Sequence, residues 1–137
     1  MKVLVDTCVW SVALRKKYPH RSEILGELSA LIKNYEACII GPIKQALLSG
    51  YSDKHKFQLL KESIEAYPNL KIDDEDYVRA AEFCNTCRAK GIQGSNTDFL
   101  ICSVSHRYVM PIFTLDNDFV SYAKCLPIKL HKSNNSI

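Results

Sequence analysis

Three aspartates in this chain follow buried apolar segments or stand at the start of a predicted helix. Asp6 ends an apolar run near the N-terminus, and Asp116 ends a second one at residues 111–115. Asp98 stands three residues after Ser95, where a helix is predicted to begin. Converging carboxylates repel one another unless a hard divalent cation neutralises them. Ligands that are all oxygen point to Mg²⁺ or Mn²⁺, which can polarise a phosphodiester and activate a water molecule.

Each of these aspartates also has a purely structural interpretation. Asp6 or Asp116 alone could cap the helix that follows it, and Asp98 fits the third position of a capping box begun by Ser95. Two aspartates that both follow buried strands are harder to explain by capping. Asp118, two residues after Asp116, is a possible fourth acid. We therefore favour a metal site and keep the capping roles as the alternative.

The elements that must position these acids alternate between strands and helices. Strands are predicted at residues 2–5, 37–40, 70–72, 111–115 and 127–130. Helices are predicted at residues 9–14, 22–34, 42–49, 53–66, 73–90, 95–107 and 119–123, with Ser22 as the N-cap of the second. This alternation is typical of an α/β fold with a central parallel sheet of about four to five strands and helices on both faces. Ligands bind beyond the carboxyl ends of such strands, where Asp6 and Asp116 are expected.

Length and composition indicate a single globular domain. The chain has 137 residues, of which 47% are hydrophobic, so it can build a core. We expect the domain to cover residues 1–131 and residues 132–137 to form a frayed tail. No apolar run approaches the roughly 20 residues of a membrane span, and the N-terminus lacks the plan of a signal peptide. A cytosolic protein is therefore expected.

The cysteines and the net charge carry little functional information. Cys84 and Cys87 form a C-x-x-C pair, but no second pair stands at zinc-ligand spacing, so free thiols are expected. The net charge of +3 is compatible with an RNA partner and does not demand one. A small basic cluster is either a solvated loop or an edge that faces RNA. Its members are Arg15, Lys16, Lys17, His20 and Arg21.

Four short motifs occur in order along the chain. They read D-T-C at residues 6–8, G-P-I-K-Q-A-L-L-S-G at 41–50, N-T-D-F-L-I-C at 96–102 and T-L-D-N-D-F at 114–119. In this order and spacing they resemble the PIN domain and, within it, the VapC-type toxins of bacterial toxin–antitoxin pairs. The resemblance covers essentially the whole chain. It implies a single PIN-like domain that cuts RNA with Mg²⁺ or Mn²⁺, forms a homodimer, and is neutralised by a cognate antitoxin that inserts a peptide into an acidic cleft.

The resemblance also assigns roles to particular residues. It makes Asp6, Asp98 and Asp116 the catalytic metal ligands, as the first, third and fourth acids of the family. The family's auxiliary acid, its two hydroxyl positions and its polar residue near the metal correspond to Asp118, Thr7, Thr114 and Asn96.

The second acid of the family is missing from this chain. The family has glutamate in G-P-I-x-Q-E-L-L, and the corresponding residue here is Ala46. Alanine offers nothing to a metal ion, so we expect weak metal binding and slow cleavage. Our hypothesis is that Ala46 was introduced to disarm a harmful ribonuclease, since the neighbouring motif residues are intact. The alternative is a naturally inactive or weakened homologue.

Two other functions compete with the impaired nuclease. A naturally inactive PIN-like domain could serve only as an RNA-binding or antitoxin-binding module. A receiver-type domain with Asp6 and Asp116 in a phosphorylation site is disfavoured. The chain has no glycine-rich phosphate loop and no strand-end lysine near the expected place.

Overall fold

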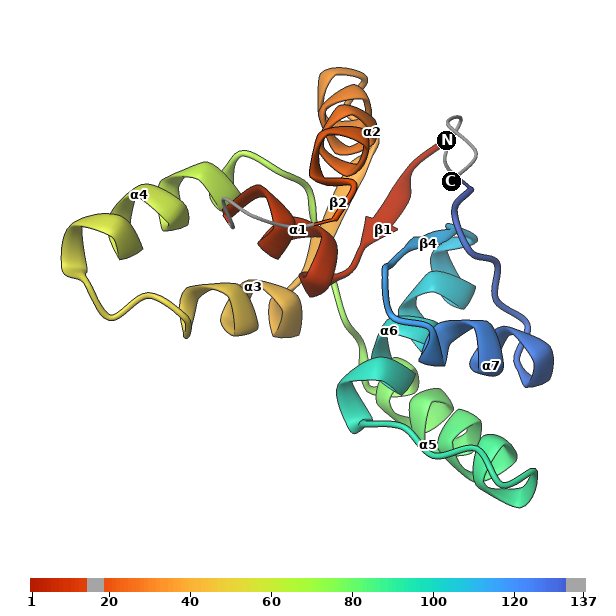
Figure 1. Ribbon diagram of the computed structural model, residues 1–137. Coiled ribbons are helices and arrows are strands. Elements are labelled where there is room, and N and C mark those ends of the chain that lie inside the picture. The colour runs from red at the N-terminus through yellow and green to blue at the C-terminus, as the bar shows by residue number, and fades with distance from the viewer. Residues whose placement is uncertain (15–18, 133–137) are drawn as a thin grey trace.

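A four-stranded parallel sheet forms the centre of the protein. The computed structural model describes residues 1–14 and 19–132 (Figure 1). The strands are β1 (Val3–Val5), β2 (Ala37–Ile40), β3 (Asn69–Leu70) and β4 (Ile112–Phe113), in the order β3-β2-β1-β4. In this order Leu4 pairs with Cys38 of β2 on one side and with Ile112 of β4 on the other. The central strand β1 therefore joins the two halves of the chain.

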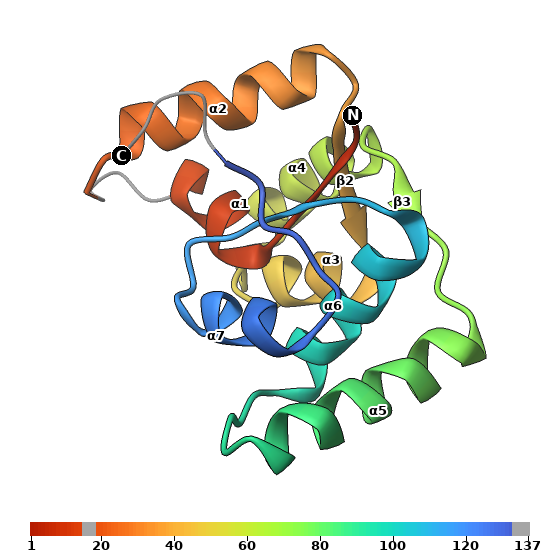
Figure 2. The same cartoon turned by 90° about the vertical axis from the view of Figure 1, so that its right-hand side faces the viewer.

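Seven helices in the described residues cover the sheet. They are α1 (Thr7–Leu14), α2 (Arg21–Lys33), α3 (Gly41–Leu48), α4 (Lys54–Glu65), α5 (Asp74–Ala89), α6 (Asn96–Tyr108) and α7 (Asp118–Cys125). Helices α1, α3 and α4 lie to one side of the sheet, and α5, α6 and α7 lie to the other (Figure 1). The view turned by 90° shows α2 and α5 at opposite ends of the molecule (Figure 2). This arrangement buries both faces of the sheet.

The core follows from the sequence of the strands. Every residue of β1 and β2 is buried, as expected for apolar strands that are covered on both faces. Helix α6 contributes an unbroken buried run from Phe99 to Ser105. Trp10 anchors α1 because its indole N–H donates to the carbonyl oxygen of Val5 at 3.0 Å. The end of β1 is thereby held in place.

The predicted fold class is confirmed, with differences at the ends of elements. The strand predicted at 127–130 is only a single parallel bridge between Leu130 and Ile112, and β4 covers two residues of the run predicted at 111–115. Ser22 was wrongly predicted as an N-cap. Helix α2 begins one residue earlier, after His20 in a left-handed conformation (φ 58°) that no side-chain pattern signals. None of the six cysteines forms a disulfide in the structure.

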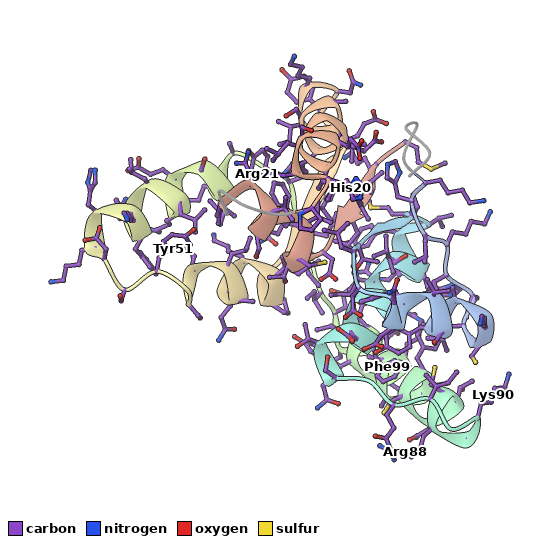
Figure 3. All side chains as sticks on the ribbon, viewed as in Figure 1. His20, Arg21, Tyr51, Arg88, Lys90 and Phe99 are labelled. Atoms are coloured by element: carbon purple, nitrogen blue, oxygen red, sulfur yellow. The ribbon has the colours of Figure 1, made fainter. Side chains whose placement is uncertain are left out.

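Some of the predictions lie partly outside the described residues. Arg15, Lys16 and Lys17 of the basic cluster are outside them, as are residues 133–137 of the tail. His20 and Arg21, labelled in Figure 3, are the described members of that cluster. Within 1–14 and 19–132, every helix is too short or too polar to cross a membrane.

A buried ionic network joins α5 to α6. The carboxylate of Asp76, wholly buried, accepts two hydrogen bonds of 2.8 Å from the guanidinium of Arg107 and one of 3.1 Å from Arg79. It also accepts the backbone N–H of Asp73 at 2.9 Å, which closes a capping box at the start of α5. The Ser103 hydroxyl donates to the carbonyl oxygen of Asp76 at 2.7 Å. The C-terminal end of α6 is thus fixed against α5.

We expect Asp76→Asn to destabilise the fold by about 3 kcal/mol, because it leaves Arg107 and Arg79 without their shared counter-charge. Burial alone would raise the pKa of Asp76, but the hydrogen bonds and charge of Arg107, together with hydrogen bonds from the backbone of Asp73 and from Arg79, outweigh it and the net pKa is lowered. The stabilisation is therefore present above the ordinary aspartate pKa of about 3.9 and is lost as the pH falls through the lower folded-state value. Urea unfolding between pH 7 and pH 3 measures both effects.

The matched control is Asp74→Asn, an exposed acid in the same first turn, for which we expect less than about 0.5 kcal/mol. Equal losses of stability in the two variants would show that the ionic network does not stabilise the fold. The same follows if the stability of Asp76→Asn falls with acid as steeply as that of the unchanged protein.

Candidate active site

Asp6 stands at the carboxyl end of β1 and is almost wholly buried, with 7% of its surface exposed. Both of its carboxylate oxygens accept hydrogen bonds. Oδ1 accepts the backbone N–H of Thr7 at 2.7 Å, and Oδ2 accepts the hydroxyl of Thr114 at 2.8 Å. The thiol of Cys8 lies 3.5 Å from the same Oδ2. This acid is therefore held in one orientation.

Thr114 links the first acid to the last two. Its hydroxyl donates to Asp6 and accepts the backbone N–H of Asp116 at 3.1 Å. Oδ1 of Asp116 in turn accepts the backbone N–H of Asp118 at 2.9 Å, at the start of α7. One chain of hydrogen bonds thus runs from the end of β1 to the first turn of α7. It follows directly from the parallel pairing of β1 with β4.

Three carboxylates come together at this edge of the sheet. One oxygen from each of Asp98, Asp116 and Asp118 lies within 4.8 Å of the others, a spacing at which the three could hold a metal ion. Asp116 and Asp118 are exposed and Asp98 is half-buried. The donor atoms are all carboxylate oxygens, the kind that Mg²⁺ and Mn²⁺ prefer.

The electrostatics of Asp98 reflect this crowding. Burial raises the pKa of Asp98 above its usual value. The negative charges of Asp6 and Asp116 raise it further, while hydrogen bonding to Tyr122 and Ser95 opposes the rise. The ionised form of Asp98 is therefore less favourable than that of a free aspartate. A cation bound at the cluster would stabilise this ionised form.

Two hydrogen-bond partners of the acids were not predicted from the sequence. The hydroxyl of Tyr122 donates to Oδ2 of Asp98 at 2.8 Å. Tyr122 lies on the buried face of α7, where its spacing from Phe119 indicates only core packing. The thiol of Cys8 lies 3.5 Å from the hydroxyl oxygen of Thr114 and accepts the N–H of Leu115 at 3.2 Å. Its place in the D-T-C motif was the available signal.

The side chains of three other residues singled out in the sequence make no hydrogen bond to these acids among the described residues. Ala46 is an exposed residue of α3. Asn96 is the first residue of α6 and lines a groove between α5 and α6 beside Tyr77 and Thr97. Thr7 contributes its backbone N–H to Asp6, and no hydrogen bond from its hydroxyl to the acids occurs among the described residues.

Comparison with known proteins identifies relatives of this fold. A family model described as the PIN domain matches residues 3–124. No curated protein matches the chain.

Three crystal structures are similar to it over nearly their whole length. The structure of VapBC2 from Rickettsia felis, bound to a DNA fragment from its promoter, has a TM-score of 0.75 at 19% identity and covers 96% of this chain and 98% of that chain. VapBC-1 from nontypeable Haemophilus influenzae has a TM-score of 0.75 at 13% identity, with coverages of 98% and 100%. FitAcB from Neisseria gonorrhoeae has a TM-score of 0.74 at 16% identity, with coverages of 97% and 99%.

Removing the hydroxyl of Thr114 tests the link between the acids. We expect Thr114→Val to lower the free energy of unfolding by about 1–3 kcal/mol, because the carboxylate of Asp6 and the amide of Asp116 both lose a partner. Thr86→Val is the matched control, since the Thr86 hydroxyl bonds only to its own helix on an exposed face. Urea unfolding compares the two, and equal losses would show that Thr114 has no special role.

Proposed function

Because this chain belongs to the PIN domain family, we propose that it is a metal-dependent endoribonuclease of the VapC toxin type. The single observation that carries the proposal is the convergence of Asp98, Asp116 and Asp118 at the carboxyl edge of the sheet. PIN domains are generally nucleases, and the acids occur in the motifs that resemble that family. We further propose that residues 1–131 form the nuclease domain and that it acts on RNA in the cytoplasm.

The chemistry of the cluster fits a hard divalent cation. Its donors are carboxylate oxygens that lie within 4.8 Å of one another. Burial, with a smaller contribution from the negative charges of Asp6 and Asp116, raises the pKa of the half-buried Asp98. We propose Asp98 and Asp116 as ligands together with Asp6, and Asp118 as the auxiliary acid beside them. Mg²⁺ or Mn²⁺ bound there would polarise the scissile phosphodiester and lower the pKa of a water molecule.

The protein's own residues supply the geometry of such a site. The hydroxyl of Thr114 holds Asp6 and the backbone of Asp116 at a fixed separation. Asp6 is almost wholly buried and both of its oxygens accept hydrogen bonds, so this ligand in our proposal is held in one orientation. Asp116 and Asp118 are exposed, so the cluster is accessible to a phosphate group from solvent. Their negative charge also keeps RNA at a distance until a cation neutralises them.

We propose that Ala46 makes this chain an impaired endoribonuclease of the VapC type. Helix α3 starts at the carboxyl end of β2, the strand next to β1, so a longer acidic side chain at position 46 extends from the same edge as Asp6. Alanine leaves one negative charge out of the ligand set. The consequence we propose is weaker metal binding and slow cleavage.

A protein partner is the second part of the proposal. The similar structures are named as VapBC, FitAB or toxin–antitoxin complexes, and some of them contain DNA. We propose that this chain likewise pairs with an antitoxin, which inserts a peptide at the acid cluster, and that it forms a homodimer. A naturally inactive module that only binds RNA or antitoxin is the competing proposal.

Restoring the missing acid tests the nuclease directly. We expect Ala46→Glu to increase Mg²⁺-dependent cleavage of a labelled RNA on the order of 100-fold over the unchanged chain, with the gain abolished by EDTA. Ala46→Gln is the matched control, because it has the same length without the charge.

Three outcomes of this assay separate the alternatives. A gain for glutamate alone supports the proposal. An equal gain for glutamine rules out a ligand role for position 46. No cleavage by either variant favours the binding module.

The antitoxin proposal makes its own prediction. We expect a short reading frame beside this gene to encode a protein with a DNA-binding N-terminal part and a C-terminal peptide that co-purifies with this chain. Light scattering of the free chain is expected to give twice the monomer mass of 15.6 kDa. A chain that co-purifies with no such product, or that is monomeric at all concentrations, contradicts the corresponding part of the proposal.

A further inference from the structure

Tyr122 connects the hydrophobic core to the acid cluster. Its side chain is wholly buried, and its hydroxyl donates to Oδ2 of Asp98 at 2.8 Å. The ring packs against Phe99 and Phe119, each with a centroid separation of 5.1 Å. Figure 3 shows Phe99 in the region where α5, α6 and α7 approach one another. The phenol is therefore fixed by aromatic packing on one side and ends at a single carboxylate on the other.

The chemistry of this contact allows only one arrangement of donor and acceptor. A tyrosine phenol is ordinarily protonated near neutral pH, whereas an ionised carboxylate can only accept a hydrogen bond. The hydroxyl of Tyr122 is therefore the donor and Oδ2 of Asp98 the acceptor. One oxygen of Asp98 is thereby engaged before any ligand arrives.

Gly94 shows how closely the chain is built around this hydroxyl. A Cβ atom at position 94 would lie 2.8 Å from Cζ and 3.0 Å from Cε1 of Tyr122, and closer still to its hydroxyl oxygen. Atoms do not approach so closely without a shift. The ring cannot move readily, because its packing partners are themselves buried. A residue without a side chain is therefore required where the loop before α6 passes over Tyr122.

We propose that Tyr122 is a positioning residue for the metal site: its hydroxyl holds Oδ2 of Asp98 so that the carboxylate is turned toward Asp116 and Asp118. This inference rests on the proposed function, since it presumes that the cluster binds a divalent cation. Without the hydroxyl, the carboxylate of Asp98 gains rotational freedom, and holding it in the ligand orientation costs entropy on binding. The contribution of Tyr122 therefore appears in metal affinity and not chiefly in folding.

The test is the affinity of the full chain for Mn²⁺, measured by the electron paramagnetic resonance signal of the free ion. We expect Tyr122→Phe to weaken binding roughly 10-fold, as removal of partners behind metal ligands does elsewhere. The aromatic packing with Phe99 and Phe119 remains in this variant, so the protein is expected to fold. Urea unfolding checks that it does.

Tyr108→Phe is the matched control. The Tyr108 hydroxyl donates to the carbonyl oxygen of Lys71 at 2.9 Å, and Tyr108 lies ten residues along α6 from Asp98, about 15 Å away. The Tyr108→Phe variant removes a phenolic hydrogen bond of similar length and leaves Asp98, Asp116 and Asp118 unchanged. Its Mn²⁺ affinity is expected to be unchanged. If both tyrosine variants lose affinity equally, the effect is a general loss of stability and the inference is wrong.

A double-mutant cycle separates positioning from other effects. If Tyr122 acts through Asp98, Tyr122→Phe has no further effect on Mn²⁺ affinity once Asp98→Asn is present. Gly94→Ala, which forces either the hydroxyl of Tyr122 or the loop before α6 to shift, is expected to weaken binding as Tyr122→Phe does. Unchanged affinity in Tyr122→Phe overturns the inference.

The two proposals fail in different ways. Binding that is lost in Asp98→Asn but unchanged in Tyr122→Phe overturns the positioning role and leaves the metal site standing. Binding that Asp98→Asn does not weaken, or no Mn²⁺ binding at all, overturns the metal site itself.

Discussion

Parallel pairing of β1 with β4 brings together the ends of two strands that lie more than a hundred residues apart in the chain. Val5 pairs with Phe113 in this register, and the backbone N–H of Asp6 donates to the carbonyl oxygen of Phe113 at 2.9 Å. Asp6 and Thr114 consequently emerge side by side, and Asp116 follows two residues later. The hydroxyl of Thr114 converts this proximity into a fixed geometry. A slip of the register by one residue would turn these side chains to the opposite face of the sheet.

Helix α6 brings the remaining acid to the same edge and is fixed at both ends. At its C-terminal end the guanidinium of Arg107 is bound by the buried carboxylate of Asp76. At its N-terminal end Ser95 accepts the N–H of Asp98, and the phenol of Tyr122 holds the carboxylate of the same residue. The helix between these points is packed in the core over a continuous run. Repulsion among the acids is therefore resisted by packing and by hydrogen bonds to neutral donors.

The sequence predicted the α/β class and the parallel sheet because these follow from local patterns. Asp6 and Asp116 were proposed from the ends of predicted strands, whereas Asp98 rests more on the family resemblance. Apolar runs identified β1 and β2, and Asp6 follows the first of them directly. The start of α2 after His20 was missed, since a left-handed residue of that type has no pattern in the sequence. Tyr122 and Asp76 fall within the helices predicted at residues 119–123 and 73–90, and nothing in the local sequence indicates their polar partners. Their partners Asp98 and Arg107 lie 24 and 31 residues away, so only the tertiary structure brings them together.

The central claim is that the acid cluster binds a hard divalent cation, and thermal unfolding of the protein with and without Mg²⁺ tests it most directly. A ligand that binds only the folded state stabilises it by about 1.4 kcal/mol when present at ten times its dissociation constant. We predict that the melting temperature rises with Mg²⁺ concentration and that this rise is lost in Asp116→Asn. The claim is contradicted if the melting temperature does not change with Mg²⁺ concentration. It is also contradicted if the melting temperature rises equally in the unchanged protein and in Asp116→Asn.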